Sequence, residues 1–111
     1  MTFDETLERW RERLFLSQMQ LTSEPLDAVS KQREVVGEIE HDLAGLPERT
    51  VRRELMDRDQ ARLEGALLHA RVCLGEGELV RARFVSESHA RKVHYNTREI
   101  TAAQSKQRRS H

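Results

Sequence analysis

The chain has 111 residues, a formal net charge of zero and 34% charged side chains, and only five of its residues are aromatic. This length has room for one domain. The low aromatic and β-branched content argues against a mostly β fold. The longest apolar runs have three residues, which is far too short to span a membrane.

The N-terminus and the cysteine content indicate the compartment. The chain starts with Met1-Thr2-Phe3-Asp4-Glu5, which lacks the basic start and apolar run of a signal peptide. Cys73 is the only cysteine, so no intrachain disulfide can form and a reducing environment is expected. We therefore expect a cytoplasmic protein without a membrane span.

The first predicted helix covers about residues 3–21. Thr2 followed three residues later by Glu5 is a capping-box pattern, and it stands immediately before a regular apolar stripe. The stripe is spaced by four and three residues in alternation, which places it on one face of a helix. Its members are Phe3, Leu7, Trp10, Leu14, Ser17 and Leu21.

The second predicted helix covers about residues 25–44. Pro25 is tolerated in a first helical turn, and the polar residues 22–24 separate this helix from the one before. Its stripe continues at heptad spacing through Val29, Gln32, Val36, Ile39, Leu43 and Leu46. Gly45 and Pro47 predict the end of this helix and the start of the next.

The third predicted helix covers about residues 47–74, with Gly75-Glu76-Gly77 as its end. Its stripe consists of Met56, Gln60, Leu63, Leu67, Ala70 and Leu74. A fourth helix is expected over about 78–96, where the alternation in residues 79–85 leaves an edge strand as the other possibility. Residues 101–111 are polar and basic and are expected to be disordered.

These elements predict an all-α fold. We expect either an elongated helical hairpin or a small antiparallel bundle of three or four helices with coiled-coil-like packing, in a single domain over residues 1–100. The polar stripe positions Gln32 and Gln60 resemble the buried polar residues that set register in coiled coils. They favour a homodimer or an obligate complex over a free monomer.

Charge is distributed unevenly along the chain. Residues 1–45 carry ten acidic and five basic side chains, net −5, and residues 46–111 carry nine acidic and fourteen basic, net +5. The two halves can attract each other, or the basic end can bind an acidic partner or nucleic acid. The candidate basic contacts are Arg81, Arg83, Arg91, Lys92, Arg98, Lys106, Arg108 and Arg109. No nucleic-acid-binding motif accompanies them.

No constellation of residues predicts catalysis, a cofactor or a metal. Glu38 and His41 have the Glu-x-x-His spacing of di-iron bundles, but the sequence contains no second copy of that motif. Cys73 lacks a second cysteine for zinc, and His69, one turn earlier, is a weak partner for a nucleophile. The Gly75–Gly77 segment lacks the other residues of a phosphate-binding loop.

The N-terminal stripe is the best candidate for a binding surface. The ordinary interpretation is that it forms the core, but aromatic side chains also dominate protein interfaces. The candidate partner-binding residues are Phe3, Leu7, Trp10, Leu14 and Phe15. We therefore expect a non-enzymatic interaction module, such as a small adaptor, a chaperone or an accessory subunit of a larger assembly such as a secretion apparatus. A nucleic-acid-binding regulator is the alternative, and no small-molecule substrate is evident.

Overall fold

The computed structural model describes the backbone of residues 2–49 and 53–109 and the side chains of residues 2–47 and 54–92. These residues form three helices and the turn between the first two: α1 (Phe3–Gln20), α2 (Pro25–Arg49) and α3 (Arg53–Arg109). The prediction of an all-α fold built as a small helical bundle is therefore confirmed. No helix in the described part of the chain is both long enough and apolar enough to cross a membrane.

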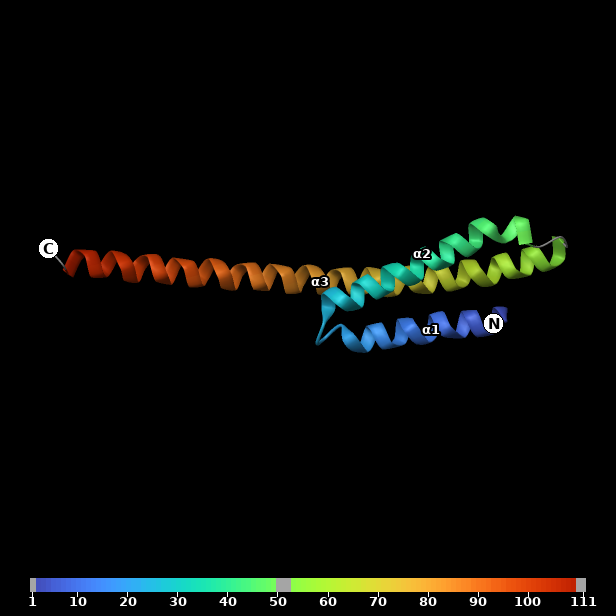
Figure 1. Ribbon diagram of the computed structural model, residues 1–111, viewed down its shortest axis with the longest axis horizontal. Coiled ribbons are helices and arrows are strands. Elements are labelled where there is room, and N and C mark those ends of the chain that lie inside the picture. Colours follow the sequence, from blue (N-terminus) through green and yellow to red (C-terminus); the bar gives the residue numbers. More distant parts are fainter. Residues whose placement is uncertain (1, 50–52, 110–111) are drawn as a thin grey trace. The chain divides into compact units, whose positions relative to one another are not determined.

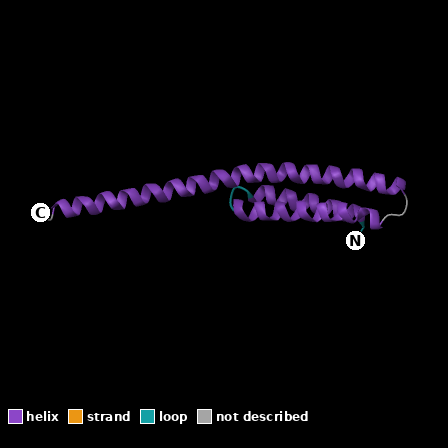
Figure 2. Ribbon diagram, turned by 90° about the horizontal axis from the view of Figure 1, so that it is seen from above, coloured by secondary structure: helices purple, strands orange, loops and turns teal. Residues whose placement is uncertain are grey.

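The chain divides into two compact units, residues 1–81 and residues 82–111. The first unit contains α1, α2 and the first part of α3, which lie side by side with α2 antiparallel to both neighbours (Figure 1). The same arrangement is visible from above (Figure 2). In the second unit the structure describes residues 82–109, which belong to α3. A single domain over residues 1–100 stays a prediction.

The start of α1 and the turn to α2 follow the sequence prediction. Thr2 is the N-cap of α1, and its Oγ1 accepts a hydrogen bond of 3.2 Å from the Glu5 backbone N–H. The α1 helix ends at Gln20, and the turn leads to Pro25 at the first position of α2. A proline costs little there, because the first N–H groups of a helix have no intrahelical partner.

Two predicted helix ends are wrong. The α2 helix continues through Gly45 and Pro47 to Arg49, and α3 continues through Gly75 and Gly77 without a break. No glycine in the described residues has a positive φ, so these glycines do not form left-handed caps. Glycine inside a helix costs only about 1 kcal/mol, and packing of Leu46 and Gly77 in the buried interior offsets that cost.

The segment after Gly77 also differs from prediction in part. Residues 79–85 are helical, as expected, and the edge-strand alternative does not occur there. The expected disordered tail is wrong over residues 101–109, which continue α3 as far as Arg109. The last two residues, 110–111, lie outside the described part of the chain.

The core of the first unit is made by the predicted stripes. Trp10 and Leu14 of α1 pack with Ile39 of α2 and with Leu63 and Cys73 of α3. The other buried members are Val35, Val36, Leu46, Leu67 and Ala70. Heptad spacing therefore identified most of the buried positions in the first unit, because seven residues complete nearly two helical turns.

The two glutamines assigned to the stripes have different environments. Gln32 is fully buried, and its side-chain amide has no hydrogen-bond partner among the described residues. Its Oε1 points at Gly77, where a Cβ atom would lie only 2.1 Å away. Gln60 is exposed and donates a 3.0 Å hydrogen bond to Glu64. The expectation that Gln60 is a polar position in the core is wrong.

Candidate functional site

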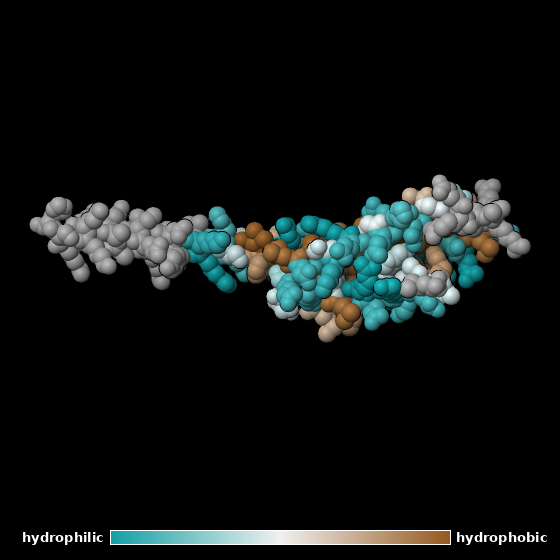
Figure 3. Space-filling view, viewed as in Figure 1, coloured by the Kyte–Doolittle hydropathy of each residue, from teal (hydrophilic) through white to brown (hydrophobic). Residues whose placement is uncertain are grey.

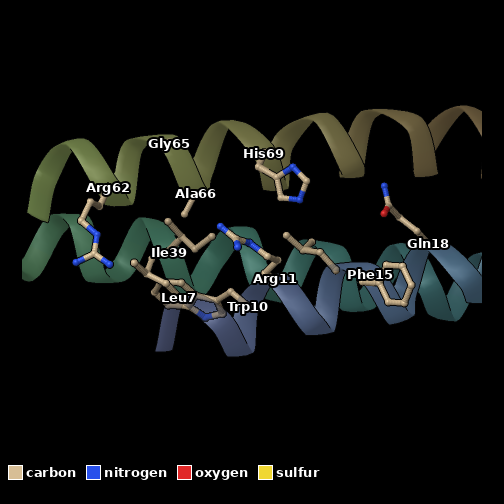
Figure 4. Close-up of a pocket in the computed structure, with 11 residues that line it drawn as sticks. Leu7, Trp10, Arg11, Phe15, Gln18, Ile39, Arg62, Gly65, Ala66 and His69 are labelled. Carbon is tan, nitrogen blue, oxygen red and sulfur yellow. The ribbon is translucent and has the colours of Figure 1, made fainter. Parts of the chain in front are cut away.

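An open groove runs between α1 and α3 in the first unit. It has a volume of about 680 Å³ and follows α1 from Leu7 to Gln18. At 1.5 Å per residue, this stretch of helix is about 16 Å long. Figure 4 shows α1 along one side of the groove, α3 along the other and α2 behind them. Leu7, Trp10, Leu14, Phe15, Ile39 and Ala66 supply its apolar side chains.

Small residues on α3 keep the groove open. Gly65 and Ala66 line it, and a Cβ atom added at Gly65 would meet no atom within 4 Å. On the opposite side, Trp10 and Leu14 are buried in the core below the groove, while Phe15 is 60% exposed at its edge. The floor is therefore part of the core, whereas the edge is accessible to another molecule.

Met19 of α1, one turn after Phe15, extends this edge and is more than half exposed. Leu16 is also more than half exposed, but it lies about 100° around the helix from Phe15, away from the groove. Figure 3 shows a mostly hydrophilic face, on which a brown patch lies near the turn between α1 and α2. A cluster of exposed apolar side chains beside an open groove is typical of a protein-binding surface.

Among the described residues, the polar side chains that line the groove carry no negative charge. Arg11 and Gln18 point from α1 toward α3, and His69 points from α3 toward α1 (Figure 4). Arg62 completes the polar lining. Arg62 also forms an ion pair with Asp4, and its guanidinium lies 4.8 Å from the centre of the Phe3 ring. These contacts fix Arg62 at one end of the groove.

The ion pair with Arg62 affects the ionisation of Asp4. A hydrogen bond from Arg62, together with its positive charge, lowers the pKa of the Asp4 carboxyl. Asp4 is fully exposed, so the effect on stability is small. The ion pair therefore positions the side chain of Arg62 more than it stabilises the fold.

Four of the five predicted partner-binding residues line the groove. These are Leu7, Trp10, Leu14 and Phe15, while Phe3 packs against the core and lies beneath Arg62. The sequence did not identify the α3 side of the groove, including Gly65 and His69. The only signal was the short side chains of Gly65 and Ala66 beside the apolar stripe.

The cysteine and histidine of α3 are not arranged as an activated nucleophile. Cys73 is buried, its Sγ lies 3.9 Å from His69 Nε2, and Gln18 Nε2 donates to Sγ at 3.3 Å. Burial raises the pKa of the Cys73 thiol, and the negative charge of Glu76 raises it further. A raised pKa keeps the thiol protonated near neutral pH, whereas the thiolate is the reactive form.

The Glu-x-x-His pair of α2 belongs to a second, polar hollow between α1 and α2. Glu38 and His41 line it, and Arg13 forms an ion pair with Glu38. Arg13 also lies 3.8 Å from Glu34. Within the residues that the structure describes, no three His, Cys, Asp or Glu side chains come together as metal ligands.

The predicted basic contacts are divided between the two units. Arg81 lies in the first unit, 3.9 Å from Glu78. Arg83, Arg91 and Lys92 are exposed in the second unit. Seen along the helix, Arg91 is about 80° and Lys92 about 180° away from Arg83, so these three do not share one face. The side chains of Arg98, Lys106, Arg108 and Arg109 lie outside the described part of the structure.

Comparisons with known proteins add no relatives. No protein-family model matches the chain, and neither a curated protein nor a solved structure does so. The geometry of the groove is therefore the basis on which a function can be argued.

Proposed function

We propose that this chain is a non-enzymatic protein-interaction module that binds an amphipathic helix of a partner protein in the groove between α1 and α3. In the cell it would act as a small cytoplasmic adaptor or chaperone, or as an accessory subunit of a larger assembly such as a secretion apparatus. The observation that carries this proposal is an open apolar groove with a purely cationic or neutral polar lining.

The dimensions of the groove support a helix as the ligand. Helix-binding grooves accept apolar side chains spaced by three and four residues, which spread over about 10 Å for three anchors. The α1 side of the groove extends over about 16 Å from Leu7 to Gln18. A docked helix would lie beside α1 and α3 and add a fourth helix to the bundle.

The charge of the lining specifies the partner further. Among the described residues, Arg11 and Arg62 are the charged side chains that line the groove, and no aspartate or glutamate lines it. Complementary charge raises the association rate and selects among partners. The expected ligand is therefore a helix with one apolar face that is flanked by acidic residues.

Filling the groove tests this proposal directly. The variant Gly65→Leu adds a side chain to the lining of the groove, and the Cβ atom of that side chain meets no atom within 4 Å. The probe is a fluorescent 18-residue helical peptide with leucines at heptad spacing and glutamates beside them. We expect Gly65→Leu to weaken binding of this peptide at least tenfold, as measured by fluorescence polarisation.

A matched glycine and a matched peptide provide the controls. Gly37 of α2 also has open space at its Cβ position but lies outside the groove, so Gly37→Leu should bind like the parent chain. A peptide with lysines in place of the glutamates should bind more weakly than the acidic peptide. Equal binding to the Gly65→Leu and Gly37→Leu variants, or no preference for the acidic peptide, would contradict the proposal.

Nucleic-acid binding through residues 79–111 stays a prediction from the sequence. The described cations of the second unit are exposed but do not share one helix face. Phosphate contacts would make the affinity for duplex DNA fall with salt, with a slope near −0.9 per phosphate neutralised. Polarisation with a labelled duplex at two salt concentrations separates this alternative from binding of a helical peptide.

A further inference from the structure

The α3 helix carries a second apolar stripe that faces solvent. Leu68, Val72, Gly75 and Leu79 follow one another at spacings of four, three and four residues. Leu68 is 67% exposed, Val72 52% and Leu79 71%. On a helix these positions point almost directly away from the buried residues Leu63, Leu67, Ala70, Cys73 and Gly77. This solvent-facing stripe is separate from the apolar face that α3 contributes to the core.

Polar side chains flank the exposed stripe on both sides, and three of the four are charged. His69 and Glu76 lie along one side of it, and Arg71 and Glu78 lie along the other. Arg71 is more than half exposed, 3.7 Å from Glu40, so its guanidinium has donors left for a further partner. The Oε1 atom of Glu78 accepts a hydrogen bond from Arg33. Its Oε2 atom lies 3.9 Å from the guanidinium of Arg81.

We propose that two copies of the chain associate through this stripe, with their α3 helices antiparallel and the two-fold axis passing between positions 73 and 74. In this register Leu68 of one copy lies opposite Leu79 of the other, and Val72 lies opposite Gly75. Each valine therefore meets a residue without a side chain, which allows the helices to approach closely. Each facing pair forms one layer of side chains between the two helices, as in an antiparallel coiled coil.

The flanking charges select this register. Arg71 of one copy faces Glu78 of the other, and symmetry repeats this pair. Sliding one helix by a full heptad in one direction brings Arg71 opposite itself, and in the other direction brings Glu78 opposite itself. Like charges at such positions are destabilising. A parallel, in-register pair would place Gly75 opposite Gly75 and leave that layer without side chains.

Sedimentation equilibrium of the full chain tests the association. We expect the mass to rise from the 13.0 kDa of one chain toward twice that value as concentration increases. Leu68→Lys and Leu79→Lys should each weaken association at least tenfold. Leu26→Lys, at an exposed leucine on α2, should leave it unchanged. A mass of 13.0 kDa at every concentration, or equal effects at the three positions, would overturn the proposal.

Charge reversal tests the register. In a dimer of Arg71→Glu, the new glutamate of each copy faces Glu78 of the other copy. In a dimer of Glu78→Arg, the new arginine of each copy faces Arg71 of the other copy. We expect the dissociation constant of the dimer to rise at least tenfold for each variant alone. An equimolar mixture of the two variants should associate again, because opposite charges then face each other in both pairs. Far-UV circular dichroism of each variant should match the parent chain. Failure of the mixture to associate would exclude the antiparallel register, since parallel pairing does not predict recovery.

Discussion

The two faces of α3 differ in environment although their composition is similar. One face places Leu63, Cys73 and Gly77 in the interior against α1 and α2, and the other exposes Leu68, Val72 and Leu79. Both faces follow heptad spacing, so periodicity alone does not say which of them belongs to the core. The comparison shows that an apolar stripe indicates a helix contact but not whether the contact lies within one chain.

The two leucines on opposite faces give the largest expected contrast. Leu63 is fully buried and Leu68 is 67% exposed. We expect Leu63→Ala to lower the free energy of unfolding by about 2–5 kcal/mol, because it removes apolar contacts and leaves a cavity. Leu68→Ala should change it by less than about 0.5 kcal/mol in dilute, monomeric protein. Urea denaturation monitored by circular dichroism measures both; similar losses would mean that the two faces are not distinct.

The side-chain amide of Gln32 on α2 lies against the buried face of α3 without a hydrogen-bond partner in the described residues. Replacing this amide should stabilise the protein. Gln32 is fully buried, and neither polar atom of its side-chain amide has a partner in the described residues. We expect Gln32→Met, which has a similar length and no such amide, to raise the free energy of unfolding by about 1–3 kcal/mol. Ile39→Met, at another buried position of α2, serves as a control for methionine in the core and should not stabilise. A loss of stability in Gln32→Met would show that the amide makes favourable interactions.

Two glycines of α3 provide a smaller contrast between the faces. A Cβ at Gly75 meets no atom within 4 Å, whereas a Cβ at Gly77 lies 2.1 Å from Gln32 Oε1. We expect Gly75→Ala to stabilise the monomer by up to about 1 kcal/mol through helix propensity. Gly77→Ala should destabilise it by about 1–3 kcal/mol through overpacking.

Coupling to Gln32 identifies the cause of the Gly77 effect. In a Gln32→Ala background the side chain that blocks the new methyl group is gone, so Gly77→Ala should cease to destabilise. Thermal melts of the four chains of this double-mutant cycle measure the coupling. Additive effects would contradict the close contact between the two residues.

Cysteines at two neighbouring positions on the two faces, 72 and 73, should differ in thiol reactivity. Burial and the nearby Glu76 raise the pKa of the Cys73 thiol, so we expect slow labelling by a thiol reagent at pH 8. A cysteine at the exposed neighbouring position, in Val72→Cys, should react at least tenfold faster. Rapid labelling of Cys73 in the folded parent chain would contradict its burial.

The same pKa shift predicts a dependence of stability on pH. A thiol whose pKa is higher in the folded chain than in the unfolded chain stabilises the fold below its ordinary pKa. That contribution is lost as the pH rises through the folded value. We therefore expect the free energy of unfolding of the parent chain to fall above about pH 9. The variant Cys73→Ala has no thiol at this position and should not show that part of the fall.

The sequence alone determined the helical fold and most of the core of the first unit. Heptad spacing identified the buried stripes of α1 and α2, and the Thr2 cap and Pro25 marked helix starts correctly. These features depend on neighbouring residues, so one sequence is sufficient to read them. Four of the five predicted binding residues lie along the groove for the same reason, because they belong to one helix stripe.

Only the tertiary structure decided where the helices continue and which surfaces stay open. Gly75 and Gly77 look like a helix end, yet packing of Gly77 against Gln32 and Val29 holds α3 helical through them. Gln60 and Gln32 occupy equivalent pattern positions, yet only Gln32 is buried. The groove also requires residues from α1 and α3 that lie about fifty positions apart. Local spacing does not encode such contacts, because burial depends on which helices pack together in three dimensions.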